Sequence, residues 1–68
     1  MSDAYSTDNL LIDAAARTEE AIAYCRKALQ QIDDTPTRLA LGQAILRIQD
    51  GRHEIRSARE MLSELDKG

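Results

Sequence analysis

The stretch DDTPTR, residues 33–38, lies near the middle of the 68-residue chain and contains its only proline. Two aspartates disfavour the carboxyl end of a helix, which already carries partial negative charge. Thr35 suits the N-cap of a new helix, and Pro36 suits its first position, where the missing N–H is not needed. The stretch therefore predicts a bend at residues 33–36 that joins two antiparallel helices, because so short a connection keeps them neighbours.

The first predicted helix covers residues 8–33, with Thr7 or Asp8 as its cap. Its seam, a set of positions with spacings of four and three, predicts one face for packing against a second helix. The seam consists of Leu11, Ala15, Thr18, Ile22, Cys25, Leu29 and Ile32. A row of small residues runs beside it at intervals of seven: Ala14, Ala21 and Ala28.

The second predicted helix covers residues 36–66 and has a heptad pattern in which large and small residues alternate. Its members are Leu41, Ala44, Ile48, Gly51, Ile55, Ala58, Leu62 and Leu65. We expect the small members to face the first helix, so that the two helices interdigitate. Gly51 costs about 1 kcal/mol relative to Ala inside a helix, which favours a packing role in close contact over a local kink.

The composition predicts an all-α fold, since Val, Trp and Phe are absent. Residues 1–7 are expected to form a flexible arm, and residues 8–68 a single helical-hairpin domain. A chain of this length rarely buries a sufficient core alone, and a single cysteine allows no internal disulfide. We therefore expect two hairpins to form a four-helix bundle, or a larger symmetric oligomer, with a dimer favoured. The predicted interface consists of Ile45, Ile48, Gly51, Ile55, Ala58, Met61 and Leu62.

Charge and hydropathy exclude several functions. A formal net charge of −3 argues against binding to non-specific DNA or to anionic membranes. No apolar run reaches the roughly 18 residues that a transmembrane helix needs. We expect a cytoplasmic protein, in the producing cell or in an infected one. Cys25 and His53 stand alone, as a small seam residue and a surface or interface residue, so the sequence predicts no metal site, no cofactor and no enzymatic activity.

Two groups of residues are candidate anion sites. Arg52, Arg56 and Arg59 recur at i, i+4 and i+7, and guanidinium groups suit phosphate or carboxylate. The alternative is that acidic residues, including those of the first helix, pair with this row. The second group is the start of the second helix, where free N–H groups meet Thr35, Thr37 and Arg38. Here too the alternative is a simple helix cap.

The two tyrosines are further candidates. Tyr24 lies just off the first seam and is expected to pack at a helix or subunit boundary. Tyr5 lies in the arm, where an aromatic side chain can pack on the bundle or stack on a ligand base.

The segment PTRLAL, residues 36–41, resembles the bend of the helical-hairpin sponges that phages use against cyclic-oligonucleotide defence signalling. The resemblance covers the bend and the first turns of the second helix. It implies a small, oligomeric, non-enzymatic protein that traps cyclic dinucleotides or trinucleotides between subunits. It also implies that Arg38 is the bend arginine of that family and that Tyr5 is an aromatic available for base stacking.

Three functions remain open from the sequence. The first is sequestration of a cyclic oligonucleotide. The second is a protein–protein interaction module, such as an inhibitor, adaptor or antitoxin-like partner, that binds a host protein through its apolar face. The third is an RNA-binding helical bundle. Whether the three arginines are paired or open separates the first two functions.

Overall fold

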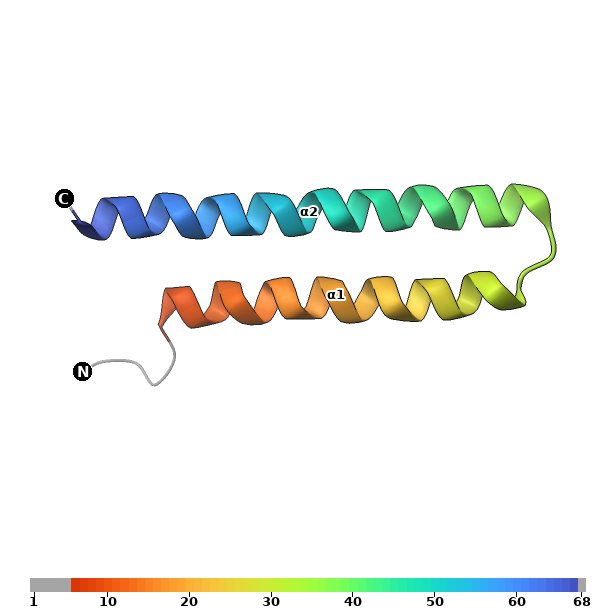
Figure 1. Ribbon diagram of the computed structural model, residues 1–68, viewed down its shortest axis with the longest axis horizontal. Helices are drawn as coiled ribbons and strands as arrows, with labels where there is room; N and C mark the ends of the chain where they lie inside the picture. The colour runs from red at the N-terminus through yellow and green to blue at the C-terminus, as the bar shows by residue number, and fades with distance from the viewer. Residues whose placement is uncertain (1–5, 68) are drawn as a thin grey trace.

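The computed structural model describes residues 6–67, with side chains to residue 65, and this part of the chain forms two α-helices. Helix α1 covers Thr7–Gln31 and helix α2 covers Thr35–Lys67. The two helices run antiparallel, side by side, and α2 extends beyond the start of α1 (Figure 1). The predicted all-α hairpin is confirmed. The helix bounds differ from the predicted bounds, 8–33 and 36–66, by one or two residues.

Each helix begins one residue earlier than predicted, because a different side chain caps it. Ser6 is the N-cap of α1, and its hydroxyl accepts a hydrogen bond from the Asn9 N–H at 3.2 Å. The carboxylate of Asp34 caps α2 in the same way, accepting from the Thr37 N–H at 2.9 Å. The predicted caps, Thr7 or Asp8 for α1 and Thr35 for α2, are therefore wrong. Pro36 still lies in the first turn, where its missing N–H leaves no hydrogen bond unmade.

The seam predicted for α1 is confirmed. All seven of its members are buried or half-buried against α2, and Ile22 is the most buried, with 5% of its surface exposed. The short side chains of Ala15 and Thr18 let α2 approach this face. The Thr18 hydroxyl donates to the Ala15 carbonyl at 2.6 Å, so it does not enter the apolar contact as an unpaired group.

The seam predicted for α2 is wrong in part, because the face turned toward α1 is rotated. Ile45, not Ala44, is the buried residue, with 8% of its surface exposed, and Ala58 is exposed. The buried and half-buried positions with spacings of four and three are Leu41, Ile45, Ile48, Arg52, Ile55 and Leu62. Arg59 occupies the position of the same pattern between Ile55 and Leu62.

The rotation follows from the size of the side chains. An arginine carries an apolar stem that packs on a seam while its guanidinium reaches water or a carboxylate at the edge. Arg52 does this, with 24% of its side chain exposed. Gly51, one of the small residues predicted for this face, is too short to contact α1. A Cβ added to Gly51 would meet no atom within 4 Å. The close helix contact predicted at Gly51 is therefore wrong, and α2 continues through it as one helix.

The hairpin is one helix thick and has a thin core. Its dimensions are 51 × 22 × 10 Å between Cα atoms. Ile22 and Ile45 are the buried hydrophobic residues of the described chain, whereas a larger group of large hydrophobic residues is exposed. That group is Leu10, Ile12, Tyr24, Leu39, Leu46, Met61 and Leu65. Two helices side by side bury only the strip between them, so both broad faces of the layer remain uncovered.

The rotated seam predicts different costs for two neighbouring truncations. Ile45→Ala removes a buried side chain and is expected to lower the free energy of unfolding by about 2 kcal/mol or more. Leu46→Ala, at a residue that is 61% exposed, is expected to change it by no more than about 0.5 kcal/mol. Urea unfolding followed by circular dichroism measures both. Equal costs would contradict the rotated seam.

Candidate functional site

Arg38 holds the end of α1 to the start of α2. Its Nη1 donates to the carbonyl oxygens of Leu29 and Ile32, at 2.6 and 2.9 Å. Carbonyls in the last turn of a helix lack their usual partner within the helix, and Leu29 accepts only a 3.3 Å hydrogen bond from the Ile32 N–H, so the guanidinium supplies a further donor. The predicted bend arginine is thus at the bend, but its side chain is already engaged with backbone acceptors.

The rest of the predicted anion site at the bend is also used internally. The Asp34 carboxylate accepts from both the N–H and the hydroxyl of Thr37. These two hydrogen bonds, the side-chain one first, lower the pKa of Asp34 below its ordinary value of 3.8. Thr35 is exposed at the first helical position. A fixed negative charge therefore sits where an anionic ligand would have to bind.

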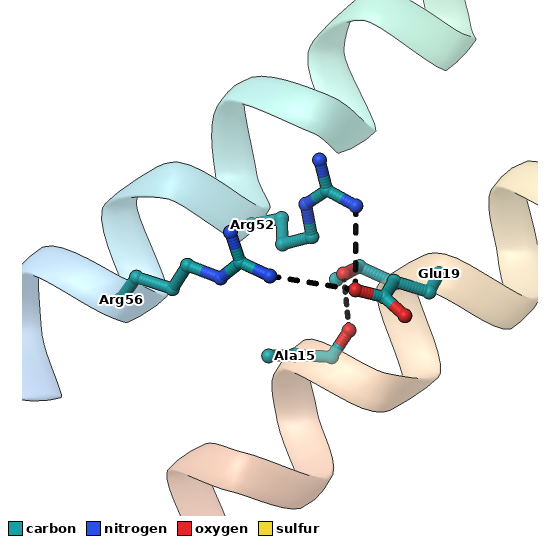
Figure 2. Close-up of polar contacts among 5 residues, drawn as sticks. Ala15, Glu19, Arg52 and Arg56 are labelled. Atoms are coloured by element: carbon teal, nitrogen blue, oxygen red, sulfur yellow. Dashed lines mark hydrogen bonds and ion pairs between the residues drawn. The ribbon is translucent and has the colours of Figure 1, made fainter.

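The arginine row of α2 is paired with acidic residues of α1. Arg52 and Arg56 both reach across to one carboxylate oxygen of Glu19, at 3.4 and 3.5 Å (Figure 2). Arg59 makes two contacts with Asp8, of which the shorter joins its Nε to the Asp8 Oδ1 at 2.7 Å. The acids of the first helix thus supply the partners, as the salt-bridge interpretation of the row expects.

The two pairings differ in quality. The two-pronged contact with Asp8 has the length of a charge-assisted hydrogen bond, and this bond followed by the charge of Asp8 raises the pKa of Arg59. The contacts with Glu19 are longer, and one oxygen serves two guanidinium groups. The Nε of Arg52 is buried and has no partner among the described residues. Glu19 therefore satisfies Arg52 and Arg56 only in part, whereas Asp8 forms a short hydrogen bond with Arg59.

Shallow hollows lie along the arginine row. One of about 410 Å³ is lined by Glu19, Ile22, Ala23, Arg26, Gln49 and Arg52. A second, of about 240 Å³, is lined mainly by apolar residues: Leu11, Ile12, Ala15, Ala16 and Ile55, with Glu19, Arg56 and Arg59 at its rim. A third, of about 580 Å³, lies near the overhanging end of α2 and includes Asp8, Arg59 and Glu60. All three are open to solvent.

The remaining candidate residues lie apart from this row. Cys25 is a half-buried free thiol in the seam, and His53 is exposed. Tyr24 is 70% exposed, so it does not pack between α1 and α2; the Lys27 amine lies 5.9 Å from the centre of its ring. Tyr5 lies outside the described residues. Among residues 6–67, no three His, Cys, Asp or Glu side chains are grouped as metal ligands would be.

The predicted interface residues fall into two groups. Ile45 is buried in the hairpin, and Ile48, Ile55 and Leu62 are half-buried against α1, so these four stabilise the hairpin itself. The prediction that Ile45 is free for an oligomer interface is wrong, because the rotated seam uses it. Ala58 and Met61 are exposed and Gly51 is half-buried.

Comparisons with protein-family models, with curated proteins and with solved structures give no match. Neither described helix is both long enough and apolar enough to cross a bilayer.

Sequence reasoning named the acids of the first helix as possible partners of the arginines but not which of these acids. The row itself is visible from its spacing, but Glu19 and Asp8 are selected by the register of the hairpin. The role of Arg38 was also missed, since backbone carbonyls as acceptors leave no trace in the sequence. Asp34 as a cap does leave a signal: it stands three residues before Thr37, whose N–H it accepts.

The lowered pKa of Asp34 predicts a pH-dependent contribution to stability. A carboxylate with a lowered folded-state pKa stabilises the fold above its ordinary pKa, and this contribution is lost as the pH falls through the folded value. The protein is expected to lose stability below about pH 4. Asp34→Asn keeps a good cap without a titrating group, so it is expected to lose less over the same interval. Thermal unfolding from neutral pH to about pH 2 measures the difference; identical pH profiles would contradict the assignment.

Proposed function

We propose that the chain is a small non-enzymatic binding protein that associates with a second copy of itself and acts through protein–protein contact. The observation that carries this proposal is a face of the hairpin along which a row of small or apolar side chains runs on each helix. We call it the alanine face. It consists of Ala14, Ala21 and Ala28 on α1 and of Ala44, Gly51, Ala58 and Leu65 on α2.

Helix geometry places these two rows on the same side of the hairpin. Residues directly before and after a seam position lie about 100° to either side of it. Ala23 and Gln49, which directly follow the seam positions Ile22 and Ile48, line one hollow together. Residues that precede a seam position, such as Ala21 and Ala44, therefore share the opposite face. Side chains this small let a second helical layer approach closely.

The exposed area of the chain exceeds that of a compact protein of the same mass. A compact protein of 7.6 kDa is expected to expose about 4,300 Å². This chain exposes 5423 Å², an excess of about 1,100 Å², whereas each partner in a stable complex of standard size gives up about 800 Å². Two hairpins stacked on their alanine faces would form the four-helix bundle expected from the sequence.

Sequestration of a cyclic oligonucleotide is the alternative, and the contacts support it less. Arg38 binds carbonyls of α1, and Arg59 is paired with Asp8. Arg52 and Arg56 share Glu19. A ligand trapped between subunits would have to displace the short contacts of Arg38 and Arg59, whereas the longer contacts with Glu19 raise a weaker objection. An RNA-binding bundle receives the same objection, together with the net charge of −3.

Ala58→Glu tests self-association. Ala58 is exposed in the hairpin, so the substitution breaks no contact between α1 and α2. It would, however, bury an unpaired charge in the proposed dimer, at a cost of roughly 2–5 kcal/mol per copy. Light scattering at micromolar concentration is expected to show a dimer for the wild type and a monomer for the variant. Because the isolated layer has a thin core, the variant is also expected to be less helical.

Ser57→Glu is the matched control, since Ser57 is the exposed neighbour of Ala58 and lies outside the alanine face. It is expected to leave the mass of the dimer unchanged. A folded wild-type monomer, or a dimer that survives Ala58→Glu, would contradict the proposed interface.

Cyclic dinucleotides and trinucleotides distinguish the two functions. We expect no rise in the melting temperature of the wild type with these ligands. Trapping between subunits predicts a rise of several degrees for the wild type and none for the dissociated Ala58→Glu variant. That result would replace protein contact with sequestration.

A further inference from the structure

The Glu19 groove lies on the face opposite the alanine face. We give this name to the two adjoining hollows that have Glu19 in common and that carry Arg26, Arg52 and Arg56 along their edges. Arg59 also borders the groove, but its charge is balanced by Asp8. Within the groove, Arg52 and Arg56 share the single carboxylate of Glu19, and Arg26 borders the same hollow as Glu19 without forming an ion pair with it. Two positive charges are therefore in excess, on a chain whose net charge is −3.

The cations of the groove are only partly satisfied by Glu19. Both cross-helix contacts end on the same oxygen, Oε2, at 3.4 and 3.5 Å. Charge-assisted hydrogen bonds between a guanidinium and a carboxylate are usually about 2.7–2.9 Å long. Arg26 has no carboxylate partner in the part of the chain that the structure describes. Two guanidinium groups thus point at one acceptor that cannot bond well with both (Figure 2).

The surroundings of Arg52 make this shortage costly. Its side chain is largely withdrawn from water, with 24% of its surface exposed, and its buried Nε has no partner among residues 6–67. A guanidinium that has lost water gains more from a second anion than an exposed one does, since the interaction is less screened. Glu19 is 53% exposed at its side chain and has room to turn toward solvent.

We propose that the Glu19 groove binds the phosphate group of a phosphate monoester. A phosphate dianion matches the two excess charges, whereas a carboxylate would neutralise only one. Its oxygens also suit the forks of Arg52 and Arg56, which approach from one helix on the same side of the groove. Arg26 and the amide of Gln49 border the hollow of about 410 Å³ and supply further donors.

The neighbouring hollow points to a monoester instead of free phosphate. It has a volume of about 240 Å³, and apolar side chains from both helices line it, including Ile12, Ala16 and Ile55. A small apolar or aromatic group attached to the phosphate fits beside these residues. Glu19 borders both hollows, so it competes with the phosphate for the same two arginines and lowers the affinity of the site.

Phenyl phosphate is the probe, and isothermal titration calorimetry or ³¹P NMR is the measurement. The wild type is expected to bind phenyl phosphate more tightly than inorganic phosphate, and both more tightly than benzoate. Binding of benzoate as tight as that of phenyl phosphate would overturn the assignment to phosphate. Equal binding of phenyl phosphate and inorganic phosphate would overturn the assignment of the apolar hollow.

Substitutions in the groove complete the test. Arg52→Gln and Arg56→Gln are expected to weaken binding by about tenfold each, and the matched control Arg47→Gln, at an exposed residue outside the groove, is expected to leave it unchanged. Glu19→Gln is expected to tighten binding about threefold or more, because it removes the competing charge. This gain cannot result from damage to the fold. Weaker binding in Glu19→Gln, an equal loss in Arg47→Gln, or no binding by the wild type would each overturn the proposal.

The groove site needs only one chain and does not depend on the proposed dimer. Phenyl phosphate is expected to bind one molecule per chain in the dimeric wild type and in Ser57→Glu alike. A stoichiometry of one ligand per two chains would place the ligand between subunits and would overturn the assignment to the groove.

Discussion

The short connection between the helices sets the register on which the other contacts depend. Three residues, 32–34, separate α1 from α2. Two side chains fix their path: Asp34 accepts from the first turn of α2, and Arg38 donates to the last carbonyls of α1. Because both ends of the bend are held, one helix cannot slide along the other. This register brings Glu19 opposite Arg52 and Arg56, and Asp8 opposite Arg59.

The thinness of the molecule explains why it needs a partner. The strip between two helices buries Ile22 and Ile45 almost completely but leaves other large apolar residues in water. Burial contributes roughly 25 cal/mol per Å² of apolar surface, so a single helical layer gains much less than a bundle of two layers. The uncovered faces differ in chemistry. One carries rows of small side chains, and the other carries arginines with too few carboxylates.

The two faces suit different kinds of partner. The rows of alanine and glycine on the alanine face allow close approach, which favours another helical surface. The Glu19 groove has an excess of positive charge and an apolar hollow beside it, which favours a small anion. Since the faces lie on opposite sides of one layer, self-association on the first leaves the second accessible. If a ligand were instead trapped between subunits, self-association and ligand binding would use the same surface.

The sequence predicted the hairpin well and the site poorly, for physical reasons that particular residues show. The bend follows from local chemistry at Asp33–Pro36, and the seam of α1 follows from its spacing. The face that α2 turns toward α1 does not follow from the spacing of apolar residues. It includes Arg52, a charged residue whose apolar stem packs in the seam. The predicted face therefore contains Ala44 and Gly51 where the structure has Ile45 and Arg52. The pairing of Arg52 and Arg56 with Glu19 depends on the register across the bend, which spacing within one helix does not contain.

The concentration dependence of thermal unfolding shows whether a second hairpin stabilises the first. If a second hairpin supplies the missing burial, unfolding is coupled to dissociation and the melting temperature depends on protein concentration by mass action. The melting temperature, measured by circular dichroism, is expected to rise steadily over about a hundredfold range of protein concentration. A cooperative transition whose midpoint stays constant over that range would show that one hairpin is stable alone and would contradict the account.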